Sequence, residues 1–368
     1  MSRKRDRRIA VIGLRGFPNI QGGVESHCRE IWTRIAASGD FQVDVYRRRP
    51  YVTDKTTRYT GIEFRELPST RIKGFEALYH SLLASLDIIG RRKAGIVNIH
   101  NIGPGLVTPL LRLFGHKAVL TYHSPNYEHK KWGRFARMIL KAGESISVRF
   151  ASRIIFVNRF QMEKFPEKIR RKSIYIPNGI TPAERTVETD FLERNNITPG
   201  KYILAVGRIT PEKGFDTLIR SIQSIDGDIR LVIAGSPDHD RQYLDRLKAL
   251  DTNGKTIFTG FTQGEDLRQL YSHARLFVMS SVNEGFPIAM LEAMTYRLPI
   301  VATDLPSSRL FPSSGQYPIL VSANDPDALS EKITAALRYP NKAVDYDLDS
   351  YNWDHIAKTT GEVYLSLL

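Results

Sequence analysis

Two carboxylates eight residues apart, Glu284 and Glu292, have the spacing in this sequence that best fits binding chemistry. Gly-Phe-Pro follows the first, and an apolar stretch that favours a helix reaches the second. Because a helix turns once per ~3.6 residues, a carboxylate at its start and another two turns further on can face one cleft. Each can accept hydrogen bonds from two neighbouring hydroxyls, so the pair suits a polyol. An isolated pair of this kind would more often be one Glu at a helix end and one on an exposed face. The neighbouring residues therefore decide whether this pair binds a ligand.

Two cations lie upstream of this pair. Residues 201–207 predict a buried strand and a helix follows from Phe215, which places Arg208 and Lys213 between a strand end and a helix start. Ligands of open α/β sheets bind at that edge, where anions also meet unpaired N–H groups. The two cations could hold a pyrophosphate and stabilise charge on a departing one. The alternative is a surface turn with a Glu212–Lys213 ion pair, which the nearby glutamates make less convincing.

At this point the chain resembles glycosyltransferase family 4, retaining enzymes of the two-domain GT-B type, over nearly its whole length. The stretches that carry the resemblance are Gly207-Arg208, Glu212-Lys213-Gly214, Ile176-Pro177-Asn178-Gly179-Ile180, and Glu284-Gly285-Phe286-Pro287 through Glu292. In the first half, Gly13-Leu14-Arg15-Gly16-Phe17-Pro18 and Gly22-Gly23-Val24-Glu25 are similar to a subgroup that contains rhamnosyltransferases of surface-polysaccharide assembly.

The resemblance implies a role for each matching residue. Glu292 would bind the ribose hydroxyls, Glu284 would contact the donor sugar near the reacting centre, and His123 matches a position that often carries a His near that sugar. The residues implied in catalysis are His123, Glu284, Arg208 and Lys213. Those implied in donor binding are Gly22, Gly23, Gly207, Arg208, Lys213, Glu284, Gly285, Phe286, Pro287 and Glu292. Of these, Arg208 and Lys213 would hold the diphosphate, and Gly22 and Gly23 would let backbone N–H groups approach the phosphates from the other domain.

The implied mechanism is retention of configuration without a metal or other cofactor, with electrostatic and positional catalysis. Asp226-Gly227-Asp228 and Asp238-His239-Asp240 resemble the metal-binding strings of transferases of another fold. Such strings arise by chance in a chain with this many acidic residues, and the first is typical of a helix-to-strand turn. We therefore expect no metal.

Strands and helices alternate in both halves, which predicts an α/β protein with two doubly wound, Rossmann-like parallel sheets covered by helices. The resemblance adds that the two domains face a central cleft. We expect an acceptor-side domain over residues 1–182, a nucleotide-sugar domain over 183–349, and a terminal helix over 350–368 that packs back on the first. The predicted strands are Ile9–Gly13, Val43–Tyr46, Ile96–His100, Ala118–Tyr122, Arg153–Val157, Tyr202–Val206, Ile229–Ala234, Thr256–Thr259, Leu276–Met279 and Ile300–Ala302.

The net charge of +14 is distributed unevenly. Residues 1–183 carry 34 Lys and Arg against 14 Asp and Glu, a net of +20, and the remainder carry 19 against 25, a net of −6. A basic face suits nucleic acid, an anionic membrane or an anionic substrate, and no nucleic-acid fold signature is present. Arg47-Arg48-Arg49 is interpreted as a solvated loop, and His100 either lines the cleft or is a satisfied buried histidine.

A membrane surface fits the basic half better than nucleic acid does. Basic residues recur at helical spacing, with apolar residues largely on other faces, so this segment could lie on acidic lipids. The alternative, a surface helix whose apolar side is core, is about equally consistent with this stretch alone. The basic residues are Lys130, Arg134, Arg137 and Lys141, and the apolar ones are Trp132, Phe135, Met138 and Ile139. The single cysteine, Cys28, fits a reducing cytosol, and no segment approaches the ~20 apolar residues of a membrane span.

These observations predict a cytoplasmic glycosyltransferase, peripheral at the inner face of the cell membrane. It would move a hexose or deoxyhexose from a nucleoside-diphosphate sugar to a glycan or lipid-linked acceptor in cell-surface polysaccharide synthesis. Rhamnosyl, glucosyl and mannosyl donors all remain open, and the subgroup slightly favours rhamnose. The alternatives are a GT-B nucleotide-sugar epimerase and a non-catalytic nucleotide-sugar scaffold. A nicotinamide dehydrogenase fits less well, because the first strand-turn lacks Gly-x-Gly-x-x-Gly.

Overall fold

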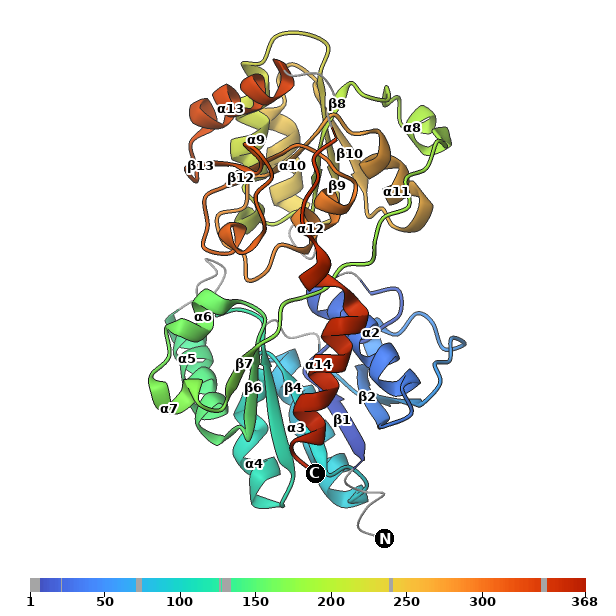
Figure 1. Cartoon of the computed structure of the whole chain (residues 1–368), viewed down its shortest axis with the longest axis vertical. Helices are drawn as coiled ribbons and strands as arrows, with labels where there is room; N and C mark the ends of the chain where they lie inside the picture. Colours follow the sequence, from blue (N-terminus) through green and yellow to red (C-terminus); the bar gives the residue numbers. More distant parts are fainter. Residues whose placement is uncertain are drawn as a thin grey trace. The chain divides into compact units, whose positions relative to one another are not determined.

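The protein, as a computed structural model, is described over residues 7–20, 22–70, 75–125, 127, 134–237, 241–338 and 343–368. It divides into two units (Figure 1). Unit 1 consists of residues 1–179 together with 350–368, and unit 2 consists of residues 180–349. Each unit is a parallel sheet with helices, which confirms the predicted α/β fold of two Rossmann-like domains. Lys130, Trp132 and the Asp238-His239-Asp240 string lie outside the described residues.

The sheet of unit 1 has the strand order β3-β2-β1-β4-β5-β6-β7, and every neighbouring pair is parallel. Its central strands β1 and β4 are buried on both faces, as in other parallel sheets, and are mostly apolar apart from Asn98 and His100 in β4. The strands are β1 (Arg8–Ile12), β2 (Gln42–Arg48), β3 (Ile62–Leu67), β4 (Ile96–His100), β5 (Lys117–Tyr122), β6 (Arg153–Phe156) and β7 (Ser173–Tyr175).

The helices of unit 1 include one from the far end of the chain. The terminal helix α14 packs along α2, because its buried Ile356 and Tyr364 join Ile31, Trp32 and Ile35 in one apolar core. The helices are α2 (Gly23–Ala37), α3 (Glu76–Arg91), α4 (Thr108–Leu113), α5 (Arg134–Phe150), α6 (Arg159–Glu163), α7 (Glu167–Arg170) and α14 (Trp353–Leu365).

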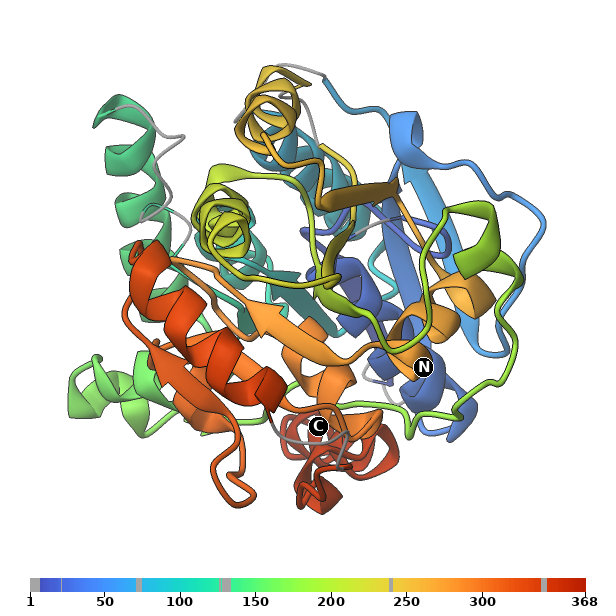
Figure 2. The ribbon, with the colours of Figure 1, turned by 90° about the horizontal axis from the view of Figure 1, so that it is seen from above.

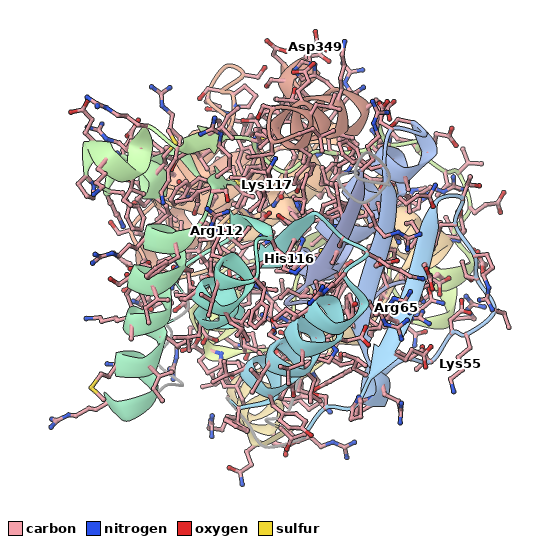
Figure 3. All side chains as sticks on the ribbon, turned by 90° about the horizontal axis from the view of Figure 1, so that it is seen from below. Lys55, Arg65, Arg112, His116, Lys117 and Asp349 are labelled. Atoms are coloured by element: carbon pink, nitrogen blue, oxygen red, sulfur yellow. The ribbon has the colours of Figure 1, made fainter. Side chains whose placement is uncertain are left out.

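The turn between α4 and β5 contacts the residues that follow α14. Figure 3 shows Arg112, His116 and Lys117 together at this turn. The Lys117 ammonium donates to the carbonyl oxygen of Leu367, and Arg112 donates to the carbonyl oxygen of His116 over 3.1 Å. The carboxyl-terminal residues are therefore part of the structure of unit 1.

The sheet of unit 2 has the order β10-β9-β8-β11-β12-β13, again with parallel neighbours. Its strands are β8 (Tyr202–Val206), β9 (Arg230–Ala234), β10 (Thr256–Gly260), β11 (Leu276–Met279), β12 (Ile300–Thr303) and β13 (Ile319–Val321). Its helices are α8 (Asp190–Arg194), α9 (Phe215–Gln223), α10 (Arg241–Leu250), α11 (Gly264–His273), α12 (Ile288–Thr295) and α13 (Pro326–Arg338).

In each sheet the strand order reverses at one place, the topological switch point. Open α/β sheets bind ligands there, at the carboxyl ends of the two strands that flank it. In unit 1 the reversal lies between β1 and β4, and in unit 2 between β8 and β11. The loops that leave these strands contain the Gly22-Gly23 segment and Arg208, Lys213 and Glu284. Among the described residues, no helix is long and apolar enough to cross a bilayer.

Candidate active site

In unit 2 the loop after β8 is held against the loop after β11. The Ser280 hydroxyl donates to the carbonyl oxygen of Lys213 over 2.9 Å, and the Val282 N–H donates to the carbonyl oxygen of Glu212 over 2.9 Å. Gly214 makes this approach possible, because a Cβ there would lie 2.2 Å from the Ser280 carbonyl oxygen. Its φ of +62° also suits glycine. The two loops thus form one support at the switch point of the sheet.

Lys213 and Glu284 meet across this support. The Lys213 ammonium lies 2.5 Å from Oε1 of Glu284, with side chains 22% and 13% exposed. The Ser281 hydroxyl donates to the same carboxylate oxygen over 2.7 Å. An ammonium carries three N–H donors, so this ion pair leaves Lys213 with donors for an anionic ligand. The pairing of Lys213 with Glu284, rather than with the adjacent Glu212, was not predicted from the sequence.

Glycines make room for Lys213 and for the strand end beneath it. A Cβ on Gly207 would lie 3.1 Å from Cε of Lys213, so the bare backbone leaves space for the lysine stem. A Cβ on Gly235, which follows β9, would lie 1.8 Å from the carbonyl oxygen of Gly207. Arg208 comes next along the chain and is partly exposed. The sequence analysis missed Gly235, because its tight contact is with a neighbouring strand end rather than within its own turn.

Glu292 lies on α12 and has a partner that the sequence analysis also missed. The buried Tyr271 of α11 donates its hydroxyl to Oε2 of Glu292 over 2.8 Å. The ring of Tyr296 stacks on Tyr271 with centroids 5.0 Å apart. Burial and the neighbouring Glu292 carboxylate raise the pKa of Tyr271 well above its ordinary value, so its proton stays in place as the donor. The Tyr271 hydroxyl therefore holds one carboxylate oxygen of Glu292 in place.

Phe286 and Pro287 lie in the interior of unit 2. The Phe286 ring packs edge-on against Phe311, with centroids 5.1 Å apart, and is only 8% exposed. Pro287 is also buried and precedes the first residue of α12. These two side chains shape the turn between Glu284 and α12. We expect any donor contact here to involve the backbone, including that of the partly exposed Gly285.

In unit 1, Gly22 and Gly23 lie at the start of α2. The Glu25 carboxylate folds back over this start, and a Cβ on Gly22 would lie 2.1 Å from its Oε2. The other carboxylate oxygen accepts from the Arg15 N–H over 3.2 Å, which ties α2 to the loop that leaves β1. The glycine segment thus has an ordered carboxylate beside it that the sequence analysis did not assign.

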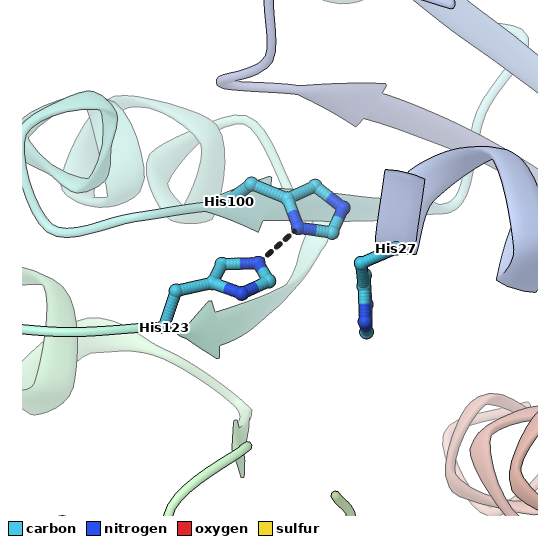
Figure 4. A group of neighbouring side chains, drawn as sticks. All are labelled: His27, His100 and His123. Atoms are coloured by element: carbon cyan, nitrogen blue, oxygen red, sulfur yellow. Dashed lines mark hydrogen bonds between the residues drawn. The ribbon is translucent and has the colours of Figure 1, made fainter. Parts of the chain in front are cut away.

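His123 follows β5 and belongs to a group of three buried histidines, which Figure 4 shows. Its Nε2 lies 3.0 Å from Nδ1 of His100, and the His27 ring stands nearly perpendicular to it, with centroids 5.0 Å apart. Nδ1 of His27 lies 2.6 Å from Oδ1 of Asn178, so the Pro-Asn-Gly stretch holds this ring. His100 is a buried, hydrogen-bonded histidine, the second of its two predicted settings.

Burial makes this group of histidines neutral at physiological pH. It lowers the pKa of His27 to about 4, and it holds the pKa values of His100 and His123 well below their ordinary range. Neutral imidazoles are also metal ligands, and the three offer nitrogens that all lie within 4.8 Å of one another. A shared ion, however, would have to replace the bond between His100 and His123, which occupies one nitrogen of each ring.

Two family models match the chain in succession. The model described as "Glycosyltransferase Family 4" matches residues 21–184, and the model described as "Glycosyl transferases group 1" matches residues 187–353. Together they cover nearly all of both units, so the chain belongs to the glycosyltransferases that these two models describe. The predicted family resemblance is confirmed at this level.

Individual relatives agree with this assignment along the whole chain. An uncharacterised glycosyltransferase of Methanocaldococcus jannaschii is 27% identical over 97% of each chain. The GDP-mannose:cellobiosyl-diphosphopolyprenol alpha-mannosyltransferase of Xanthomonas oryzae pv. oryzae is 25% identical over 93% of each. Among solved structures, the sucrose-phosphate synthase of Thermosynechococcus elongatus superposes with a TM-score of 0.80 at 22% identity, over 98% of this chain and 99% of that one. This last likeness concerns the fold.

Proposed function

We propose that the protein is a retaining, metal-independent glycosyltransferase that transfers a hexose or deoxyhexose from a nucleoside-diphosphate sugar. The observation that carries the proposal is the support at the switch point of unit 2. There Arg208 and Lys213 lie in the loop after β8, and Glu284 lies in the loop after β11. Two cations at the carboxyl edge of a parallel sheet suit a diphosphate, and a carboxylate beside them suits the hydroxyls of a sugar.

The assigned residues would share the work of the transfer. A bond forms between the acceptor oxygen and the anomeric carbon while the bond from that carbon to the diphosphate oxygen breaks, and the acceptor proton leaves with the diphosphate. Arg208 and Lys213 stabilise the negative charge that develops on the departing oxygen, which is the largest electrostatic demand of the step. Glu292 binds the ribose, Glu284 orients the sugar, and His123 contacts it. The backbone at Gly22 and Gly23 approaches the phosphates.

The acceptor that we propose is a glycan or a lipid-linked sugar in the assembly of a cell-surface polysaccharide. The Xanthomonas oryzae relative, by its name, is a mannosyltransferase that uses GDP-mannose and a diphosphopolyprenol-linked acceptor. That relative supports a mannosyl donor and a polyprenol-linked acceptor, whereas the resemblance of the glycine segment favours rhamnose. Both donors belong in the first substrate panel, together with UDP-glucose.

A thermal-shift panel with UDP, GDP, dTDP and ADP tests the donor site. A diphosphate at ~100 times its dissociation constant should stabilise the native state by about 2.7 kcal/mol. In Glu292→Ala we expect its binding free energy to weaken by about 1.5–3 kcal/mol for each of the one or two charge-assisted hydrogen bonds that are lost. Glu292→Gln keeps an acceptor for the Tyr271 hydroxyl. It should also lose affinity for the diphosphate, but its ligand-free melting temperature should change less than that of Glu292→Ala.

The control for this panel is Glu331→Ala, which removes an exposed carboxylate from α13 of the same unit. Equal diphosphate affinity in Glu292→Ala and wild type would contradict the ribose assignment. No shift with any diphosphate would instead favour a non-catalytic scaffold. Conversion of the donor sugar without any acceptor would identify an epimerase.

We further propose that unit 1 binds an anionic membrane at the cytoplasmic face through α5. On this helix Arg134, Arg137 and Lys141 are exposed, and Met138 and Ile139 are 59% and 36% exposed. Figures 2 and 3 show α5 at the outer side of its unit. Basic residues beside solvent-facing apolar ones suit the boundary between lipid headgroups and acyl chains, and they weaken the alternative that this apolar side is core.

Sedimentation with anionic liposomes tests the membrane proposal. Reversal of Arg134, Arg137 and Lys141 to Glu should weaken vesicle binding by at least ~3 kcal/mol, since each basic residue near an anionic leaflet contributes about 1 kcal/mol. The matched control reverses Lys168, Arg170 and Arg171, which are exposed at α7 and give the same change in net charge. If both triple variants lose binding equally, the effect reflects overall charge and the assignment to α5 is wrong.

A further inference from the structure

A row of hydrogen-bonding nitrogens runs through the core of unit 1 to His123. The indole Nε1 of Trp32 lies 3.3 Å from Nε2 of His100, and the amide nitrogen of Asn98 lies 2.8 Å from the same atom. Nδ1 of His100 then faces Nε2 of His123 over 3.0 Å (Figure 4). Trp32, Asn98 and His100 are completely buried, whereas His123 remains 8% exposed. The row therefore leads from the interior towards the surface.

The chemistry of Trp32 sets the direction of every bond in this row. An indole N–H can only donate, so Nε2 of His100 must accept and carries no proton. The Thr121 hydroxyl donates to Oδ1 of Asn98 over 3.1 Å, which turns the Asn98 amide N–H groups towards His100 as a second donor. A neutral His100 must then carry its proton on Nδ1, which donates to His123. Nε2 of His123 accepts, so the proton of a neutral His123 lies on Nδ1.

We propose that Trp32 and Asn98, acting through His100, fix His123 in its Nδ1–H tautomer so that it meets the donor substrate as a hydrogen-bond donor. Trp32, Asn98 and His100 are positioning residues in this scheme. The functional part rests on the proposed function, in which His123 contacts the sugar of a nucleoside diphosphate. A ring of this tautomer with Nε2 already occupied has no free lone pair, so it presents its N–H to a hydroxyl or phosphate oxygen and cannot take a proton from the acceptor.

The tautomer can be read directly by NMR. In the protein with ¹⁵N-labelled histidine, long-range ¹H–¹⁵N correlations distinguish a ring protonated at Nδ1 from one protonated at Nε2. The His123→Gln variant identifies the signals of His123. We expect wild-type His100 and His123 both to carry the proton on Nδ1. A wild-type His123 protonated at Nε2 overturns the proposal, whatever any variant does.

The double variant Trp32→Phe with Asn98→Asp reverses the row, because it removes the indole donor as well as the amide donor at Nε2 of His100. Its carboxylate presents only acceptors to Nε2 of His100, so that nitrogen should take the proton and Nδ1 should become an acceptor. Nε2–H of His123 would then donate to His100, and Nδ1 of His123 would lose its proton. We expect the His123 signals to switch tautomer and kcat/KM with the donor sugar to fall about tenfold or more, as for the loss of one donor at the reacting centre. In Trp32→Phe, Asn98 remains as a donor, so we expect the tautomer to be retained.

Tyr364→Phe is the matched control, because the Tyr364 ring lies against Trp32 with centroids 5.6 Å apart in the same core. Neither the tautomer nor kcat/KM should change in it. A switched tautomer with unchanged kcat/KM overturns the role in donor recognition. If the wild-type tautomer is as expected but no donor sugar is turned over, the proposed function fails and the hydrogen-bonded row stands. Zinc that binds stoichiometrically and replaces the correlation pattern with metal-bound signals would overturn the proposal in favour of a metal site.

Discussion

Lys213→Ala should lower kcat/KM of sugar transfer by about 10²–10³-fold, the usual effect of removing one group that stabilises charge at a reacting centre. Lys213 lies at the switch point of unit 2, between the bare backbone of Gly207 and the Glu284 carboxylate. Its loss also leaves the largely buried Glu284 carboxylate without the cation that neutralises it, which should lower the melting temperature.

Two further variants separate the catalytic effect from the structural one. The double variant Lys213→Ala with Glu284→Gln removes the unpaired charge, so it should regain thermal stability but not activity. Lys201→Ala removes an exposed ammonium from the opposite end of β8, where it pairs with Asp228, and should leave both quantities unchanged. A Lys213→Ala enzyme with near-normal kcat/KM would show that the diphosphate is held elsewhere.

Unit 1 should lose stability steeply as the pH falls from about 6.5 towards 4. Burial lowers the pKa values of His27 and His80 to about 4, so the folded chain keeps them neutral in a range where the unfolded chain binds protons. The unfolded state is then favoured by about 1.4 kcal/mol per pH unit for each such histidine. Over the whole range this amounts to about 3 kcal/mol each for His27 and His80, and the buried His100 and His123 shift in the same direction.

Thermal unfolding at about pH 7 and about pH 5 measures this effect, since stability must fall wherever the unfolded state binds more protons. Unit 2 is the internal reference, because His273 is the one histidine among its described residues and it is partly exposed. His80→Leu should flatten the pH dependence of unit 1 without touching the residues assigned to the donor. A transition of unit 1 that does not move between the two pH values would contradict the buried neutral state.

Much of the fold could be predicted because the central strands are mostly apolar runs that alternate with helical segments. All ten predicted strands occur, with ends that differ by at most two residues. The strands that were missed, β3, β7 and β13, lie at sheet edges. β7 and β13 are three residues long, too short for alternation to show, whereas the alternation of apolar and charged residues over Ile62–Arg65 in β3 was present and was missed. Edge strands are often short or charged, which reduces pairing with other chains.

The environment of a side chain is harder to predict from sequence when it contacts a residue on a distant strand or helix. Arg47 and Arg48 were interpreted as part of a solvated loop, and this interpretation was wrong. Both end β2 and are buried, Arg47 against Glu66 at 2.6 Å and Arg48 in an ion pair with Glu76. Three consecutive arginines predict solvation only when no carboxylate on an adjacent strand or helix neutralises them, and that neighbourhood depends on the sheet order.

The same reason explains which parts of the candidate site could be anticipated. Arg208, Lys213, Glu284 and Glu292 are recognisable because each lies at a strand or helix end with a characteristic local pattern. Tyr271 gave no such signal, because its link to Glu292 depends on the packing of α11 against α12. The row from Trp32 to His123 joins α2, β4 and the residue after β5, so no short stretch of sequence indicates it.

The return of α14 to unit 1 has a consequence for synthesis on the ribosome. Unit 2 is one continuous segment, so it can fold as soon as residues 180–349 have emerged. The apolar face of α2 around Trp32 must wait, since its partners Ile356 and Tyr364 are made only after all of unit 2. Until then the nascent chain exposes that face, and transiently exposed apolar surface of this kind favours aggregation. The unit that is translated first is therefore the last to be completed.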